Sequence, residues 1–600
     1  MNSEHFDAVI IGSGFGGSVM AYRLAEAGFR VCLLERGKPY PPNSFPRAPY
    51  DLGKNFWDPS KGYYGMLDVW SFKGSGALVS SGLGGGSLIY ANILIRKDPK
   101  WFITENRDGG VYESWPVTYK DLEPHYERVE KMMNAQKYPL KHEPYNNTPK
   151  TLAMIEAESK LSSIPGFDPK WTHRWIPLNL AVSFRARHVS GPDDDDANNP
   201  PIVGAQLRED LPNYHTVKAG REMPRSSCRL CGECDIGCNY GSKNTLDYTY
   251  VTAAIHQKPY PAEVRTLCEV KQIAPISGGG YQVKYIQHDL KNMGIPLDMG
   301  QQHRIPITCD RLIISAGTFG SPFLLLKNQD HFPGFNRNKK LGSRFNVNGD
   351  LLSFIVKSME TKNGKCVPRR LDPSFGPVIT SAIRIGDTLD GDGDQGRGFY
   401  VEDGGNPYLL SWVSEIAGIP AAIPRLLKFA RMFLKYRIGL NNDADLSGEI
   451  ADLLGPADTS LSSLPVLTMG RDYPNGNLYL KGGMLECDWT QKKSQEYFNR
   501  VIRVGRSIAR ALNAELMENP SYEYLRQVLT AHPLGGCPMA NSEAEGVVDA
   551  NGEVFNYPGL HVVDGSMMPG PVGPNPSLTI GAMSDRVADY IIGQKKGAIK

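Results

Sequence analysis

The first forty residues alternate between apolar runs and glycine in the order typical of a βαβ unit. Residues 6–11 form a short apolar run with several β-branched side chains, which predicts a buried strand. A glycine-rich turn and a helix-like stretch follow, and Gly28 is expected to end that helix near Ala27. Residues 31–35 predict a second buried strand. The pattern therefore predicts two strands joined by a helix at the start of the chain.

Beyond this unit, the periodicity predicts further helices and strands but no repeat of fixed length. Helices are expected at residues 122–135, 152–162, 494–512 and 576–592. Strands are expected at residues 264–273, 281–287, 306–314 and 560–564. Loops are expected at residues 38–75, 191–201 and 390–397. Because no low-complexity linker separates independent units, the pattern favours two interleaved domains over four in a row.

The composition narrows the class of protein. In a chain of 600 residues, 41% hydrophobic and 22% charged residues exclude a wholly disordered protein. The net charge of +2 gives no field that would attract nucleic acid. No window of about 18 uncharged apolar residues occurs, so we expect no membrane-spanning helix. Residues 1–6 are polar and lack the pattern of a secretory signal, and we therefore expect an intracellular, cytoplasmic protein.

Gly12, Gly14 and Gly17 form a G-x-G-x-x-G motif between the first strand and the first helix. The first glycine permits a tight turn, the second lets the backbone approach a pyrophosphate, and the third lets helix and strand pack closely. The helix N-terminus offers N–H groups to phosphates, and Glu35 after the next strand can accept hydrogen bonds from ribose hydroxyls. The alternative is a glycine-rich turn in an unrelated α/β protein. The expected dinucleotide-binding residues are Gly12, Ser13, Gly14, Phe15, Gly16, Gly17 and Glu35.

Further motifs carry a resemblance to a known family. They are Gly-Leu-Gly-Gly-Gly-Ser at residues 82–87, Ile-Ser-Ala-Gly-Thr at 314–318 and a C-terminal block at 531–577. The block contains His-Pro-Leu-Gly-Gly-Cys, then Val-Asp-Gly-Ser, then Val-Gly-Pro-Asn-Pro. In these motifs and in their order, the sequence resembles the glucose–methanol–choline (GMC) oxidoreductases and, within them, the cholesterol oxidase branch. The resemblance implies FAD rather than NAD.

The resemblance also implies a fold. It is an α/β (mixed α+β) fold in which a Rossmann-like FAD-binding domain is interleaved with a substrate domain built on an antiparallel sheet with helices. The FAD-binding domain is expected at residues 1–98, 226–330 and 531–600. The substrate domain is expected at residues 99–225 and 331–530.

Several positions along FAD follow from the same resemblance. Gly86 and Ser87 are expected to lie along the flavin, and Val270 is expected to contact the adenine end through its backbone. The Val-Asp-Gly-Ser motif would hold the ribityl and phosphate groups. The last motif opens the terminal helix, whose N-terminus would stabilise negative charge at the N1–C2=O edge of the reduced flavin. The implied contacts are Gly86, Ser87, Val270, Asp564, Gly565, Asn575 and Pro576.

Oxidation of an alcohol needs a group that orients the hydroxyl and accepts its proton, and histidine suits this because its pKa lies near neutral pH. His532 lies in a turn-rich segment, and the resemblance places it over the flavin with Asn575 as its hydrogen-bonding companion. Glu415, in the sequence Trp-Val-Ser-Glu-Ile-Ala, resembles the glutamate that serves cholesterol oxidases as a base, including in shifting the double bond of the steroid product. The alternatives are a structural histidine and a carboxylate paired with an arginine.

Four of the ten cysteines, at the spacing C-x2-C-x2-C-x3-C, lie within eleven residues. This spacing matches the ligation of an iron–sulfur cluster of the bacterial ferredoxin kind, although Asn239 stands where a proline usually follows. We expect a [4Fe–4S] cluster, with zinc on four thiolates as the competitor and thiols or disulfides without metal as the third interpretation. The expected ligands are Cys228, Cys231, Cys234 and Cys238.

The sequence thus predicts an FAD-dependent enzyme that oxidises a secondary alcohol by hydride transfer to flavin N5. The first candidates are 3β-hydroxysteroids, with ketosteroid isomerisation as a second step. Electrons would pass to O2, or to a redox partner in an FAD/iron–sulfur dehydrogenase. A different class is a non-catalytic flavoprotein that binds a sterol-like ligand or relays electrons. Residues 425–438 form a basic amphipathic stretch that would cover the substrate cavity or lie on a membrane surface.

Overall fold

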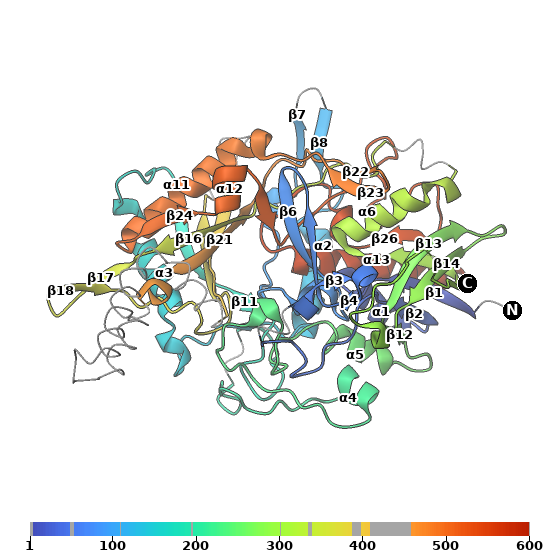
Figure 1. Ribbon diagram of the computed structural model, residues 1–600, viewed down its shortest axis with the longest axis horizontal. Helices are drawn as coiled ribbons and strands as arrows, with labels where there is room; N and C mark the ends of the chain where they lie inside the picture. The colour runs from blue at the N-terminus through green and yellow to red at the C-terminus, as the bar shows by residue number, and fades with distance from the viewer. Residues whose placement is uncertain are drawn as a thin grey trace, which may run out of the picture.

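Two large β-sheets organise the chain and lie toward opposite ends of the molecule (Figure 1). The sheet that contains the first strand is at the end where both termini are drawn. The predicted loop at 390–397, the stretch 425–438 and Glu415 fall outside the described residues. The computed structural model describes residues 4–48, 53–107, 110–193, 196–300, 302–333, 339–386, 398–407 and 458–598.

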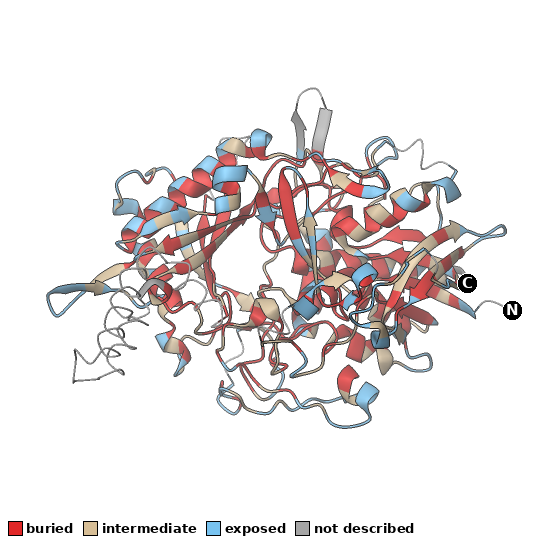
Figure 2. Cartoon of the chain, in the orientation of Figure 1, coloured by how far each residue is buried: buried red, intermediate tan, exposed pale blue. Residues whose placement is uncertain are grey.

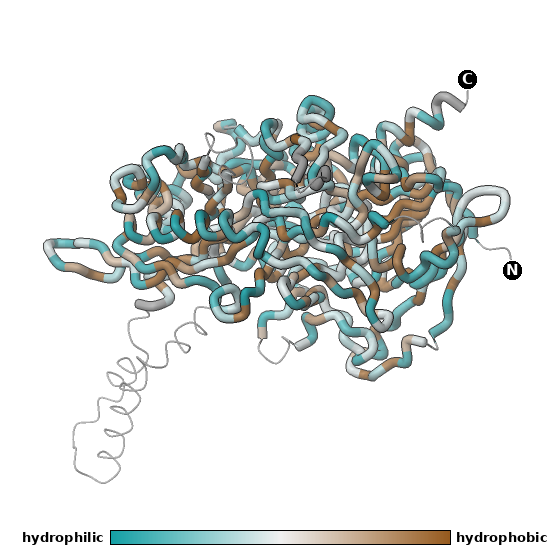
Figure 3. Tube along the Cα trace, turned by 90° about the horizontal axis from the view of Figure 1, so that it is seen from above, coloured by the Kyte–Doolittle hydropathy of each residue, from teal (hydrophilic) through white to brown (hydrophobic). Residues whose placement is uncertain are grey.

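A seven-stranded sheet forms the first lobe. Its order is β12 (Glu263–Arg265), β2 (Val31–Leu34), β1 (Glu4–Ile11), β15 (Ile305–Ile314), β14 (Tyr281–Gln287) and β13 (Cys268–Pro275), with β26 (Leu560–Val562) also paired to β15. β1 runs parallel to β2 and β15, whereas β14 is antiparallel to both of its neighbours. Residues 8–11 of β1 and all of β2 are buried on both faces, and for this reason both are continuous apolar runs. Figure 3 shows apolar chain gathered in the interior of this lobe.

Helices from distant parts of the chain pack together beside this sheet. α1 (Phe15–Glu26) contacts α13 (Ser577–Ala598) and α5 (Tyr250–Ile255), and α13 contacts α2 (Tyr119–Met132). α2 begins at a capping box in which Thr118 and Asp121 bond each other's backbone N–H. The predicted helices at 122–135 and 576–592 are confirmed, with ends shifted by up to six residues. The two ends of the chain therefore form one unit.

The prediction of a single strand over residues 264–273 is wrong. β12 ends at Arg265, β13 begins at Cys268, and the two strands pair with different neighbours, β2 and β14. Leu267 between them has a φ of +60°, a conformation that breaks an extended strand. The Cys268 N–H donates to the Glu35 carbonyl at 2.8 Å. The break therefore places the start of β13 beside the nucleotide-binding motif.

A six-stranded antiparallel sheet forms the second lobe. Its order is β10 (His173–Pro177), β19 (Ser381–Ile385), β20 (Phe399–Asp403), β21 (Leu464–Gly470), β16 (Leu351–Val356) and β24 (Glu515–Glu518). α3 (Pro149–Lys160) and α11 (Gln495–Ala511) pack against it and bury their apolar faces (Figure 2). These helices confirm the predictions at 152–162 and 494–512, and the fold is of the expected mixed α/β class. The boundaries of the five domain segments stay a prediction.

A small three-stranded sheet connects the C-terminal block to the N-terminal part of the chain. It pairs β25 (Val528–Thr530) in parallel with β6 (Ser75–Ser80), which is antiparallel to β5 (Leu67–Ser71). This pairing brings the residues just before His532 beside the start of β6, and the glycine-rich segment follows the end of β6. Because β5 lies within 38–75, the prediction of a loop throughout that range is wrong: β5 forms a hairpin with β6, most of which lies beyond the end of that range. None of the described helices has both the length and the apolar character needed to cross a bilayer.

Candidate active site

A cavity of about 1350 Å³, here called the cofactor cavity, extends from the nucleotide motif to the second sheet. Its wall includes the turn between β1 and α1 at one end and Leu352 and Leu467 of the second sheet at the other. His532 and Asn575 also lie on this wall. Ligand cavities usually measure about 300–1,000 Å³, so this one has room for a dinucleotide and a second molecule.

The glycine motif leaves space where a nucleotide backbone would lie. Gly12 has a φ of +95°, and a Cβ there would lie 2.3 Å from the Ser315 carbonyl oxygen. A Cβ on Gly17 would lie 1.9 Å from the Gly12 carbonyl oxygen, so this glycine allows the close packing of α1. Gly14, by contrast, lines the cavity, and no atom of the described residues lies within 4 Å of its Cβ position. A side chain at Gly14 would fill the space that a pyrophosphate needs, so these residues fit a dinucleotide.

Glu35 is held in place directly behind this turn. Its Oε2 accepts from the Ser13 N–H at 3.0 Å and from the Ser13 hydroxyl at 2.5 Å. Its Oε1 accepts from the Gly37 N–H at 2.8 Å. The carboxylate is buried but still lines the cavity. It therefore has the fixed position that recognition of a ribose requires.

The structure brings together most of the other expected FAD contacts. Phe15, Gly16, Gly86, Val270, Asp564, Gly565 and Pro576 all line the cofactor cavity. Asp564 accepts hydrogen bonds from the Gly317 N–H and from the N–H and hydroxyl of Ser566, and burial raises the pKa of its carboxyl. Ser87 and Gly17 are not part of the wall. The Ser87 hydroxyl faces the protein, where it donates to the Gly84 carbonyl at 2.7 Å.

His532 is positioned by a carboxylate that sequence reasoning missed. Its Nδ1 lies 2.9 and 3.0 Å from the two carboxylate oxygens of Asp350, which is fully buried. Asp350 Oδ2 also accepts from the Thr530 hydroxyl and the Ala531 N–H. Because a carboxylate only accepts hydrogen bonds, this contact assigns the proton to Nδ1 and leaves Nε2 as an acceptor.

A second missed carboxyl group lies behind Asn575. Glu402 on β20 is fully buried, and its Oε2 accepts a long hydrogen bond of 3.5 Å from Asn575 Nδ2. Burial raises the pKa of the Glu402 carboxyl well above its usual range. Within the described part of the chain, neither Glu402 Oε1 nor Asn575 Oδ1 has a hydrogen-bonding partner. Asn575 lines the cavity, so its free oxygen is available to a ligand.

The four cysteines of the C-x2-C-x2-C-x3-C motif surround a small void of about 20 Å³ and are here called the cysteine cage. Two of them are buried and two half-buried, and none forms a disulfide. Among the described residues, no three of the four sulfur atoms all lie within 4.8 Å of one another. The side chain of Lys243 also lines the void.

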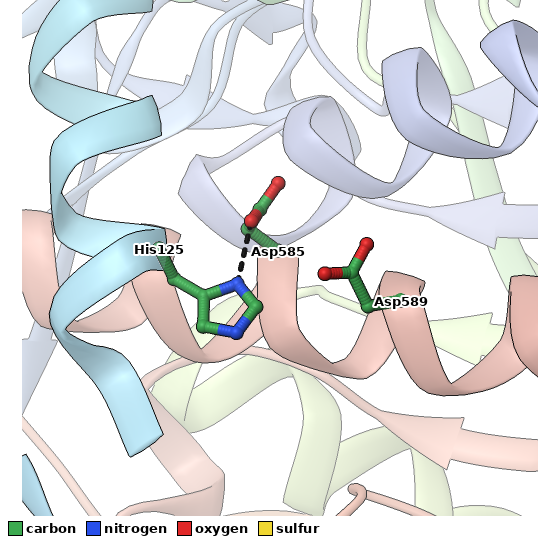
Figure 4. Close-up of side chains that lie close together, drawn as sticks. All are labelled: His125, Asp585 and Asp589. Atoms are coloured by element: carbon green, nitrogen blue, oxygen red, sulfur yellow. Dashed lines mark hydrogen bonds and ion pairs between the residues drawn. The ribbon is translucent and has the colours of Figure 1, made fainter. Parts of the chain in front are cut away.

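His125, Asp585 and Asp589 form a cluster with the spacing of metal ligands, but its charges are already satisfied (Figure 4). His125 Nδ1 lies 2.6 Å from Asp585. Arg23 and Arg128 each contact both carboxylates. Although burial opposes ionisation, these partners hold the pKa of Asp585 below its usual range. The cluster is therefore an ion-pair network that ties α13 to α1 and α2.

Comparison with known proteins agrees with this arrangement. A family described as GMC oxidoreductase matches residues 475–584, and an NAD(P)-binding Rossmann-like domain matches residues 10–41. The cholesterol oxidase of Mycobacterium tuberculosis is 28% identical, over 97% of this chain and 90% of its own. The cholesterol oxidase of Acinetobacter baumannii is 26% identical, over 98% of this chain and 95% of its own. The solved structure of pyridoxine 4-oxidase from Mesorbium loti shares the fold, with a TM-score of 0.54 and 16% identity over 97% of this chain and 98% of its own.

Proposed function

We propose that this chain, which belongs to the GMC oxidoreductases, oxidises a bulky apolar secondary alcohol in the cofactor cavity. A 3β-hydroxysteroid is the first candidate. The observation that carries the proposal is that His532, held by Asp350, lies at the wall of a cavity that also contains the nucleotide motif. The family acts on alcohols and uses FAD, and a non-catalytic flavoprotein would not need a histidine oriented in this way.

FAD would be held by the glycine motif, by Glu35 and by the wall residues Gly86, Asp564 and Gly565. When bound, FAD supplies the acceptor for the hydride that leaves the alcohol carbon. The fit rests on the open space at Gly14 and Gly86, where no atom lies within 4 Å of a Cβ position. It rests also on the free Oδ1 of Asn575 at the same wall.

The residues of the chain supply the proton chemistry. We infer that His532 Nε2 accepts the hydroxyl proton while the carbon–hydrogen bond breaks, so that the alcohol loses one proton and one hydride and becomes a ketone. Asp350 holds the Nδ1–H and stabilises the imidazolium that forms. Asn575 orients the oxygen of the substrate, and Glu402 accepts a hydrogen bond from the Asn575 amide.

The wall beyond His532 supports an apolar substrate. Trp70 and Phe319 stack at 5.3 Å between ring centroids, and both line the cavity. Val69 and Leu529 line it too, although they are 59% and 45% exposed, so they mark its mouth. An apolar mouth suits a substrate drawn from a membrane surface, and we propose peripheral membrane contact on this ground. If isomerisation occurs, Glu402 or Glu415 would be its base.

The cysteine cage is the basis of a second proposal, a [4Fe–4S] cluster. In a tetrahedral zinc site, each thiolate sulfur lies about 2.3 Å from the zinc ion, so the four sulfur atoms lie only about 3.8 Å from one another. In a cubane each thiolate binds a different iron, so the sulfur atoms lie farther apart. No three of the four sulfur atoms lie within 4.8 Å of one another, which is wider than one zinc ion needs and supports a cluster over zinc. A cluster favours a dehydrogenase that passes its electrons to a redox partner. In an enzyme without a cluster, the expected electron acceptor is O2.

The free state of all ten cysteines supports a cytoplasmic location for the protein. Disulfides are rare in reducing compartments, and three of the buried thiols, Cys32, Cys268 and Cys309, lie in one sheet without being paired. We therefore propose the cytoplasm as the compartment in which the enzyme acts.

A substrate panel tests the proposed function. The purified enzyme is assayed with a 3β-hydroxysteroid, its 3α epimer and a primary long-chain alcohol, in air and with an artificial acceptor. We expect turnover of the 3β-hydroxysteroid, and hydrogen peroxide in air identifies an oxidase. His532→Ala should keep FAD but slow flavin reduction by at least about 10²-fold. Flavin that is shifted in spectrum by the steroid but never reduced would identify a binding protein instead.

A further inference from the structure

One loop forms part of the wall of both the cofactor cavity and the cysteine cage. Asp235 and Ile236 lie between two cysteines of the cage, Cys234 and Cys238, and both line the cofactor cavity. Lys243 follows the same loop and faces the void of the cage. The two sites are therefore separated by little more than the thickness of one chain segment.

Lys243 is bonded to both sides of this boundary. Its side chain is 1% exposed, and its Nζ donates to the Cys234 carbonyl at 2.7 Å. The same Nζ donates to the carbonyls of Leu88 at 3.1 Å and Tyr90 at 2.9 Å. Tyr90 lines the cofactor cavity, and Leu88 ends the short helix η3 (Gly85–Leu88) that contains Gly86. One ammonium thus fixes the cysteine loop and the flavin-facing segment together.

The charge of Lys243 has no carboxylate as a direct partner. Among the described residues, no acidic side chain forms an ion pair with it; its Nζ donates to three carbonyl oxygens and lies 4.9 Å from the centroid of the Tyr90 ring. The nearby Asp247 is bonded instead to His215, at 2.6 Å. Asp235 is the other nearby carboxyl group, and its Oδ1 has no hydrogen-bonding partner among the residues that the structure describes. A buried cation is costly unless negative charge lies close to it. A cluster on four thiolates carries net negative charge, so an occupied cage would supply it.

We propose that Lys243 couples the cysteine cage to the cofactor cavity, so that its positive charge raises the redox potentials of both the cluster and the flavin. This inference rests on the iron–sulfur cluster proposed above. A fixed cation favours the addition of an electron to any group near it, because the reduced form carries more negative charge. Since Lys243 contacts the loop of one site and the wall of the other, it acts on both.

The test compares three variants of the holoenzyme, purified without oxygen. Lys243→Met removes the charge but keeps the length of the side chain, and Lys243→Arg keeps the charge. Lys595→Met is the matched control: it removes the same charge at a site where Nζ donates to the Gly28 carbonyl and lies over Phe29, and neither residue lines either site. Iron, acid-labile sulfide and FAD are measured first. Midpoint potentials of the cluster and the flavin are then measured by spectroelectrochemical titration.

We expect wild type to contain iron, sulfide and FAD. In Lys243→Met, the ratio of reduced to oxidised cluster at a fixed applied potential should fall at least about tenfold. This change corresponds to a midpoint potential lowered by ~59 mV for a one-electron couple. The flavin midpoint should fall as well, while Lys243→Arg and Lys595→Met stay close to wild type. If Lys243→Met does not fold, Lys243→Gln provides the same comparison.

Two different results would separate the failure of this inference from that of the cluster. Wild-type protein without iron and sulfide would overturn both. Wild-type protein with iron and sulfide, together with a folded Lys243→Met or Lys243→Gln whose two potentials are unchanged, would overturn the coupling and leave the cluster proposal standing.

Discussion

The contact between Asp350 and His532 allows a sharp test by Asp350→Asn. An asparagine can present its NH2 group to Nδ1, which would then have to accept, and the proton would move to Nε2. Nε2 could no longer take the hydroxyl proton of the alcohol. The variant keeps the volume of the side chain and leaves the glycine motif and Glu35 untouched. We therefore expect FAD to remain bound while reduction of the flavin slows.

The size of this effect follows from the geometry. The two oxygen atoms lie 2.9 and 3.0 Å from Nδ1. Hydrogen bonds to charged groups contribute about 1.5–3 kcal/mol, which corresponds to a rate reduced roughly 10- to 150-fold. The Coulomb attraction between an imidazolium and a carboxylate at this distance, about 5–6 kcal/mol at an effective dielectric constant of about 20, is the upper limit.

The assay is anaerobic stopped-flow measurement of flavin reduction by a 3β-hydroxysteroid. Asp403→Asn is the matched control, because Asp403 is equally buried and accepts from Thr380 and Ser381 rather than from His532. We expect slow reduction in Asp350→Asn only, with unfolding free energies lowered in both variants. Reduction within twofold of wild type in Asp350→Asn would refute the role assigned to the carboxylate.

Three further predictions concern other buried groups. Glu402→Gln keeps a hydrogen-bonding partner for Asn575 but removes a group that could accept a proton from the substrate. We therefore expect alcohol oxidation to persist and the isomerised share of the product to fall. An unchanged product ratio, measured by chromatography, would count against Glu402 as a base. Asp585→Asn removes the buried carboxylate that pairs with Arg23 and Arg128, and it should lower the free energy of unfolding in denaturant by about 3–5 kcal/mol. The side chain of Asp589 is 45% exposed, so Asp589→Asn should lower that free energy by at most about 1 kcal/mol. Burial lowers the pKa of His561 to about 4, so protonation of this histidine favours the unfolded chain. The free energy of unfolding therefore contains the full contribution of neutral His561 above about pH 6.5. This contribution falls by about 3 kcal/mol as the pH is lowered toward 4. His561→Leu should flatten this part of the pH–stability curve, and an unaltered curve would contradict the assignment.

The sequence predicted those parts of the site that depend on local patterns. The glycine motif, Glu35 and the C-terminal block are recognisable because each needs particular residues at fixed spacing. Ser87 shows the limit of this reasoning, since it stands in a motif along the cavity but turns its hydroxyl into the protein. A residue's neighbours in sequence do not determine which way its side chain points.

Asp350 and Glu402 could not be found in the sequence by spacing. They lie 182 and 173 residues from the side chains they contact, and only the pairing of strands in the second sheet brings them to the site. One signal was available for Glu402: it is an acidic residue within the apolar strand sequence Phe-Tyr-Val-Glu-Asp. The split between β12 and β13 was missed for a related reason, because a single residue, Leu267, in a left-handed conformation leaves no mark on hydrophobic periodicity.

The central claim is that His532 acts on an alcohol beside a flavin in the cofactor cavity. A single anaerobic mixing of the purified protein with a 3β-hydroxysteroid tests it most directly. The account predicts that the oxidised flavin band disappears in wild type and that the corresponding 3-ketone is formed in an amount equal to the flavin. A colourless protein, or a flavin band that persists with every sterol and apolar alcohol offered, would contradict it.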